Sequence, residues 1–148
     1  MSHAHTRLDD CRLVDLARFV SPEGSLTPVE GERDVPFPIE RVYYLYDVPG
    51  GEARGGHAHR ELRQLIVAAS GAFDILIDDG HERRTIRLDR AFRGLLLPPM
   101  IWRELENFSS GAVCLVLASA SYDEADYVRE YDAFQQDKHA APPGTAGA

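Results

Sequence analysis

A pair of histidines, His57 and His59, set between glycines at Gly51 and Gly71, is the feature that most constrains this chain. Gln64 lies between the pair and the second glycine. Side chains two positions apart on a strand project from the same face. On the inner face of a barrel, the two imidazoles would therefore enter one cavity. A bare His-x-His also fits two ordinary histidines near a loop, but the surrounding spacing favours the cavity.

This spacing resembles the first metal-binding motif of the cupin barrels, with Gln64 where that motif has a carboxylate. The second cupin motif can be placed on residues 98–107, and it puts Arg103 where the last histidine ligand is expected. A neutral amide carries no charge to offset a cation, and a guanidinium has no lone pair to donate. The resemblance therefore predicts an all-β cupin, or jelly-roll, barrel that has lost its metal and whose two histidines are free to titrate.

The bulk properties exclude several classes of protein. A chain of 148 residues is long enough for one domain with its own core. The net charge of -8 argues against a general nucleic-acid binder, which needs clustered Lys and Arg. No apolar run approaches the ~18 residues of a membrane span, and the first residues do not resemble a signal peptide. We expect a cytoplasmic protein whose Cys11 and Cys114 are reduced.

Most of the chain alternates short apolar runs with turn residues, which is typical of an all-β sandwich or barrel. Asp79-Gly80 indicates a hairpin turn. One short helix is expected over 122–134, because Val128, Tyr131 and Phe134 are roughly in helical phase. We therefore expect a single cupin domain over 1–134 and a mobile C-terminal tail over 135–148. Strands are expected over 11–19, 26–29, 41–48, 62–68, 72–78, 83–88, 95–97, 101–105 and 112–119.

The cavity suggests proton abstraction beside a carbonyl group without a metal. A neutral imidazole with an ordinary pKa of about 6.5 is a competent proton acceptor, and a second group nearby can fix its tautomer or donate a proton. The enolate oxygen that develops needs hydrogen-bond donors, and Arg103 and Gln64 on neighbouring strands are suitable. An exposed surface position is the alternative for Arg103.

Basic and aromatic residues near the motif suggest a substrate with a diphosphate. Arg41, Arg54 and Arg60 surround the histidines in sequence, and forked cations suit phosphate groups. Solvated positions at strand ends are the alternative for each of them. Tyr43 and Tyr44 point to opposite faces of their strand, and core packing competes with a role in binding for both. Trp102 must point away from Arg103.

Several longer segments are similar to the FdtA/WxcM-like nucleotide-sugar 3,4-ketoisomerases. They include Arg41-Val-Tyr-Tyr44, Arg54-Gly-Gly-His-Ala-His59, Pro99-Met-Ile-Trp-Arg-Glu104 and Tyr122-Asp-Glu-Ala-Asp-Tyr127. The similarity covers about residues 8 to 134. It implies an isomerase that moves the keto group of dTDP-4-keto-6-deoxy-D-glucose from C4 to C3 in deoxyamino-sugar biosynthesis. No metal, nicotinamide or other cofactor is implied.

The same resemblance implies roles for individual residues. His57 and His59 would be the catalytic pair, one removing the C3 proton and the other, directly or through a relay, returning a proton at C4 of an enediol. We expect His59 to be the C3 base. Substrate contacts are expected from eight residues: Arg41, Tyr43, Tyr44, Arg54, Arg60, Gln64, Arg103 and Asn107.

Two further expectations concern assembly and stereochemistry. Family members are usually homodimers that exchange N-terminal strands, which would also cover an exposed strand edge. Arg103, directly after Trp102, resembles the enzymes that form the gluco configuration at C4. Glu23 departs from the family, which often has arginine in that turn, so the C4 configuration stays open.

Three other functions are compatible with parts of the pattern. A metal-free dTDP-sugar 3,5-epimerase would exchange solvent hydrogen at C5. A non-catalytic sugar-binding cupin module would bind the ligand without exchange at any carbon. A metal-dependent oxygenase or isomerase would contain stoichiometric iron, manganese or zinc.

Overall fold

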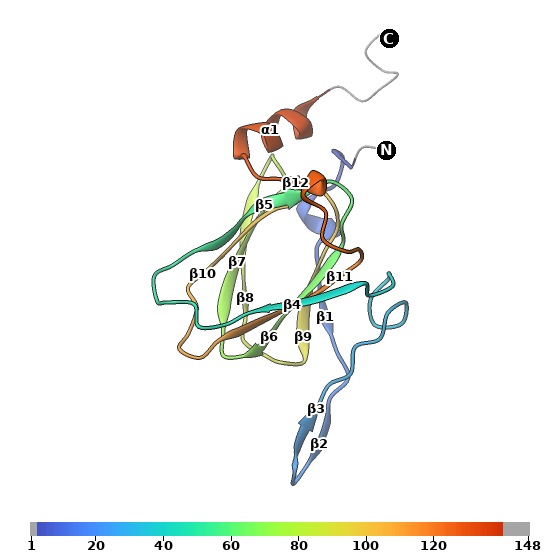
Figure 1. The fold of residues 1–148 in the computed structure, drawn as a ribbon, viewed down its shortest axis with the longest axis vertical. Coiled ribbons are helices and arrows are strands. Elements are labelled where there is room, and N and C mark those ends of the chain that lie inside the picture. Colours follow the sequence, from blue (N-terminus) through green and yellow to red (C-terminus); the bar gives the residue numbers. More distant parts are fainter. Residues whose placement is uncertain (1–2, 141–148) are drawn as a thin grey trace.

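A computed structural model describes residues 3–140 and contains two five-stranded antiparallel sheets that face each other as a jelly-roll barrel (Figure 1). One sheet has the order β1-β9-β6-β11-β4 and the other β12-β5-β10-β7-β8. The strands are β1 (Arg12–Asp15), β2 (Phe19–Ser21), β3 (Gly24–Leu26), β4 (Arg41–Leu45), β5 (Arg54–His59), β6 (Gln64–Ser70), β7 (Phe73–Asp78), β8 (Arg83–Leu88), β9 (Arg93–Leu97), β10 (Trp102–Glu106), β11 (Val113–Ala118) and β12 (Tyr127–Val128). The predicted all-β cupin architecture is confirmed.

The core follows from the two-residue period of the strands. On β7, Phe73, Ile75 and Ile77 share one face and are fully buried in the barrel interior. On β4, Tyr43 and Leu45 pack against the same cluster, whereas the alternate residues of that strand are exposed. The interior is therefore apolar over most of its length, which leaves its polar groups at one end of the barrel.

Two turns require glycine. Gly80, in the predicted hairpin between β7 and β8, has a φ of 90°, a conformation that other residues rarely adopt. Gly71 joins β6 to β7 with a φ of 65°, and a Cβ there would lie 2.5 Å from Oγ of Ser109 and 2.9 Å from Cα of Ala112. Gly71 of the motif is thus needed for its backbone conformation and for space.

The prediction of one helix over 122–134 is wrong. The Asp123 side chain accepts a hydrogen bond from the amide of Ala125 and begins a single 3₁₀ turn, η2 (Glu124–Asp126). Strand β12 then pairs with β5, and the helix α1 spans Tyr131–His139. Val128, Tyr131 and Phe134 follow one another at steps of three because all three pack on one cluster with Trp102, although only Tyr131 and Phe134 are helical.

The start of the expected tail is also ordered. Residues 135–139 belong to α1, and Nζ of the buried Lys138 donates to the carbonyl oxygens of Thr6 (2.6 Å) and Met100 (3.1 Å). Phe134 of α1 also packs in one cluster with Trp102, which points away from Arg103 as predicted. The part of the expected tail at 141–148 lies outside the described residues.

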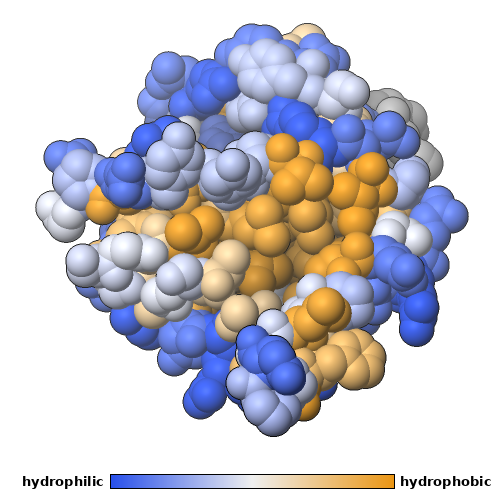
Figure 2. Space-filling view, turned by 60° about the horizontal axis from the view of Figure 1, so that its bottom comes forward, coloured by the Kyte–Doolittle hydropathy of each residue, from blue (hydrophilic) through white to orange (hydrophobic). Residues whose placement is uncertain are grey.

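The N-terminal region forms two short elements instead of one strand over 11–19. β1 pairs with β9, and β2 and β3 form a hairpin that projects from the barrel (Figure 1). Phe19 (61% exposed), Val20 (67%) and Leu26 (61%) are on this hairpin. Figure 2 shows that hydrophobic side chains also gather over the middle of one face of the molecule. No helix within residues 3–140 is long and apolar enough to cross a membrane.

Candidate active site

Strand β5 places His57 and His59 side by side at one end of the barrel. Both point inward, as the two-residue spacing predicts, and His59 is fully buried. Their Nε2 atoms are 3.1 Å apart, and the rings meet edge to face with centroids 4.8 Å apart. The two rings are thus within hydrogen-bonding distance of each other.

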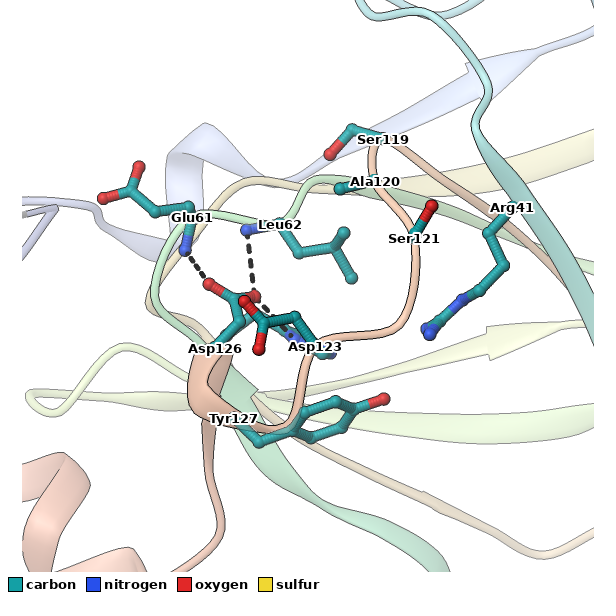
Figure 3. A pocket seen from close by; sticks show the side chains of 10 residues that line it. Arg41, Glu61, Leu62, Ser119, Ala120, Ser121, Asp123, Asp126 and Tyr127 are labelled. Carbon is teal, nitrogen blue, oxygen red and sulfur yellow. Dashed lines mark hydrogen bonds and ion pairs between the residues drawn. The ribbon is translucent and has the colours of Figure 1, made fainter.

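Asp126 extends this pair into a row of three side chains. Its Oδ2 lies 3.1 Å from Nδ1 of His59. Backbone amides hold the carboxylate in place, with Glu61 donating to Oδ1 (2.8 Å) and Leu62 to Oδ2 (3.3 Å), as Figure 3 shows. The 3₁₀ turn η2 and the pairing of β12 with β5 bring Asp126 to the histidines.

The row of hydrogen bonds defines which ring nitrogens carry hydrogen. The Asp126 carboxylate can only accept, so Nδ1 of His59 donates to it. A neutral His59 then has its lone pair on Nε2, which accepts from the Nε2–H of His57. His57 keeps one ring nitrogen with a lone pair, and His59 keeps none that is unengaged.

Burial and nearby cations keep both rings neutral. Burial is the main cause that lowers the pKa of His57 to about 3, and the Arg103 and Arg129 guanidiniums lower it further. Burial and the Arg103 charge also lower the pKa of His59. The contact with Asp126 opposes this shift, but desolvation of an imidazolium at a fully buried position is the larger effect. At neutral pH both rings are therefore unprotonated.

Arg103 lies inside the barrel and connects to two other predicted residues. Its Nη1 donates to Oε1 of Gln64 (2.5 Å), and Nε2 of Gln64 donates to the hydroxyl of Tyr43 (3.1 Å). Its Nε donates to the carbonyl of Ile101 (3.1 Å), and its buried Nη2 has no partner. Burial lowers the pKa of Arg103 to about 10, so the side chain is still a cation at neutral pH.

The side chains at the four cupin ligand positions do not fit a divalent cation. Arg103 occupies one position and takes the oxygen of Gln64 at another. The Nε2 atoms of the two histidines face each other. Between residues 3 and 140 no group of three or more His, Cys, Asp or Glu side chains could hold a metal ion.

A cavity of about 410 Å³ opens between β4, β5 and the segment that carries β12. We call it the substrate cavity. His57, Tyr43 and Leu105 line it, and so do three arginines: Arg41 on β4, Arg54 on β5 and Arg129 directly after β12. Nε of Arg41 is buried and has no partner. The cavity thus combines a neutral base with several cations.

Five of the eight predicted substrate contacts do not line this cavity. Gln64 and Arg103 are buried inside the barrel and do not reach its wall. The other three lie at the surface. Tyr44 is 59% exposed on the outer face of β4. Nη1 of Arg60 forms an ion pair with Oδ2 of Asp137 on α1 (2.9 Å). Asn107 adopts a left-handed turn conformation after β10, and its Nδ2 donates to Asp74 at the surface (3.0 Å).

Three residues near the site did not emerge as candidates from the sequence: Asp126, Tyr127 and Arg129. Tyr127 contacts both imidazole rings, with centroids 5.1 Å from His57 and 4.4 Å from His59. Arg129 forms two hydrogen bonds to Glu124 (2.6 and 2.8 Å) and lies over the Tyr127 ring. All three residues lie in the segment 122–134, for which the sequence predicts a helix. A helix there gives no reason to bring them to the histidines.

Comparisons with known proteins identify the family of this chain. The family model described as "WxcM-like, C-terminal" (FdtA) matches residues 9–139. A TDP-4-oxo-6-deoxy-α-D-glucose-3,4-oxoisomerase from Aneurinibacillus thermoaerophilus is 41% identical over 125 residues, which are 84% of this chain and 90% of the relative.

Two solved structures are also similar. The TDP-quinovose 3,4-ketoisomerase of Campylobacter jejuni has 42% identity and a TM-score of 0.83, covering 87% of this chain and 99% of its own. A mutant of the 3,4-ketoisomerase QdtA from Thermoanaerobacterium thermosaccharolyticum, in complex with TDP-4-keto-6-deoxyglucose, has 37% identity and a TM-score of 0.87, covering 89% and 96%. The chain therefore belongs to the FdtA/WxcM-like family and is a sugar 3,4-ketoisomerase.

Proposed function

We propose that this enzyme converts dTDP-4-keto-6-deoxy-D-glucose into its 3-keto isomer through an enediol, by histidine acid–base catalysis. The observation that carries the proposal is the neutral His57 ring on the wall of the substrate cavity, backed by His59 and Asp126. The relative with 41% identity acts on this sugar by its name, and the related QdtA mutant was solved with it.

His57 is the better candidate for the C3 base, which reverses our expectation from the sequence. His57 lines the substrate cavity, and in this tautomer its second ring nitrogen carries a lone pair. A hydrogen bond to the Gly55 backbone favours the ring once it is protonated. His59 does not line that cavity, is fully buried, and has both ring nitrogens engaged, one by His57 and one by Asp126. His59 is therefore suited to accept a proton from His57 and return it.

Cations around the cavity fit the rest of the substrate. Arg41, Arg54 and Arg129 line the cavity and would bind the diphosphate. The Arg103 charge and its unpartnered Nη2 favour negative charge on the oxygens of the enediol. The Tyr43 hydroxyl, whose pKa burial raises, keeps its proton at neutral pH and can donate it in a hydrogen bond.

Arg103 resembles the enzymes that form the gluco configuration at C4, a centre that the C4 ketone of the substrate lacks. The TDP-quinovose ketoisomerase with 42% identity is named for a gluco-configured sugar. In a gluco-configured ring the hydrogens on C3 and C4 lie on opposite faces, so transfer by one base from one face would give the axial C4 hydroxyl of the galacto product. We propose a product with a C3 ketone, and the coupling between its H4 and H5 distinguishes an axial from an equatorial C4 hydroxyl.

The direct test is to incubate the enzyme with dTDP-4-keto-6-deoxy-D-glucose and follow the product by ¹³C and ¹H NMR. We expect the ketone carbon to move to C3, with no solvent hydrogen at C5. Exchange at C5 without a C3 ketone would indicate 3,5-epimerisation instead. Tight binding with no exchange at any carbon would indicate a binding module.

We also propose that the protein is a homodimer that exchanges its N-terminal hairpin. The hairpin β2–β3 projects from its own barrel with large apolar side chains exposed. A cavity of about 470 Å³ on the outer face of the first sheet, lined by Leu16, Val29, Val67 and Leu115 among others, offers apolar surface beside it. A partner copy could cover both.

Sedimentation should therefore give twice the mass of the 16.5 kDa chain. Phe19→Asp should shift the protein toward the monomer, because it places a charge in the covered surface. Thr85→Asp, on the exposed strand β8, is the control and should stay dimeric. A wild-type protein that sediments as a monomer at micromolar concentration would contradict the proposal.

A further inference from the structure

The catalytic row of side chains lies between two separate cavities. His57 lines the substrate cavity, whereas His59 and Asp126 line a second cavity of about 210 Å³. Arg41 and Tyr127 line both and form the wall between them. Figure 3 shows this second cavity, which we call the rear cavity, with Asp126 and Arg41 on opposite sides of it.

The exposure of the row rises from the buried His59 to Asp126 at the rear cavity. The His59 side chain is 1% exposed, and that of Asp126 is 16% exposed. The two steps between them are short, with 3.1 Å from His57 to His59 and 3.1 Å from His59 to Asp126. Ser119 and Ser121 add polar groups to the same cavity. A proton that reaches Asp126 therefore has a route to solvent that does not pass through the substrate cavity.

We propose that the rear cavity is a proton port, through which hydrogen removed from the sugar exchanges with solvent while the substrate cavity is occupied. The inference rests on the proposed ketoisomerase function. It predicts that the hydrogen added at C4 comes from solvent and not from C3 of the same molecule.

The steps balance in both directions. When the C3–H bond breaks, its electron pair forms the C3=C4 double bond and the carbonyl pair moves onto the C4 oxygen. His57 takes the proton and passes its Nε2 proton to His59, and His59 passes its Nδ1 proton to Asp126, which releases it to water in the rear cavity. The reverse transfers bring a solvent proton to C4, while the hydroxyl proton on the C3 oxygen goes to the C4 oxygen. No oxidant or reductant is required.

The test is the isotope content of the product formed in D₂O. With unlabelled substrate and short reaction times, we expect nearly complete deuterium at C4 of the 3-keto product, measured by NMR and mass spectrometry. A 3-keto product that keeps the original C3 hydrogen at C4 would overturn the port and leave the isomerase intact. Failure to form any 3-ketone would overturn the isomerase itself, and with it the port.

A variant that fills the rear cavity tests the route. Ser121→Leu adds a branched apolar side chain to the wall of this cavity. We expect the deuterium fraction at C4 to fall several-fold, because the proton returns to the sugar before it exchanges. The fraction is read per product molecule, so a change in kcat does not affect it.

Ser110→Leu is the matched control, on the surface turn between β10 and β11, and it should keep the wild-type fraction. An unchanged fraction in Ser121→Leu would show that exchange occurs through the substrate cavity and would overturn the port.

Discussion

Replacing His57 by asparagine is expected to lower kcat by about 10³-fold, because the substrate cavity then has no imidazole to take the C3 proton. Asparagine keeps a polar group of similar size beside His59. The arginines that line the cavity are unchanged, so the affinity for dTDP should stay within a few-fold of the wild type. Steady-state kinetics and dTDP binding by calorimetry measure the two quantities separately.

His59→Asn should also lose most turnover and still bind dTDP, because His57 then has no partner to take its proton. His81→Asn, at an exposed position in the β7–β8 turn, is the control and should keep wild-type kinetics. Full activity in either site variant would remove that histidine from the proposed chemistry. An equal loss of dTDP affinity and kcat would instead indicate a collapsed site.

Replacing Asp126 by asparagine should lower kcat by about 10²- to 10⁴-fold, although Asp126 does not line the substrate cavity. The range follows the effect of the same exchange in serine proteases, where an aspartate holds a histidine in one tautomer. The amide nitrogen of asparagine would face Nδ1 of His59, because the backbone amide of Glu61 still needs the remaining oxygen. His59 would then carry hydrogen on Nε2 and could not accept a proton from His57.

The effect should appear in kcat and not in substrate affinity, because Asp126 acts through His59. Asp132→Asn removes the same charge at an exposed position in the first turn of α1 and should leave kcat within a few-fold. A merely structural role for Asp126 would lower the thermal stability and leave the kcat of the folded fraction unchanged. That result would contradict its assignment as a positioning residue.

The sequence was sufficient to predict the part of the site that lies on regular strands. The two-residue period places His57 and His59 on one face, and the spacing to Gln64 and Arg103 brings both of these inside the barrel. The same period places Tyr43 inside and Tyr44 outside, so the two tyrosines could be separated by parity alone. The hydrogen bonds that join Arg103, Gln64 and Tyr43 depend on side-chain rotamers, which parity does not determine.

The part of the site that could not be predicted lies on the irregular segment after β11. Asp126 reaches His59 only because η2 and β12 replace a helix, and their formation depends on pairing with β5, which is far away in sequence. The spacing of Val128, Tyr131 and Phe134 at steps of three fits a helix equally well. Arg60 was misplaced for a related reason, since its partner Asp137 lies on a helix that begins later than expected.

The most direct test of the account is ¹⁵N NMR of the histidine rings in the free enzyme. We expect His57 and His59 both to be neutral from pH 7 to pH 5, with no titration near pH 6.5, because burial and Arg103 lower both pKa values. We expect the hydrogen of the His59 ring to be on Nδ1. Asp126→Asn should move the His59 hydrogen to Nε2. A His57 or His59 ring that is protonated at pH 7, or a wild-type His59 with hydrogen on Nε2 alone, would contradict it.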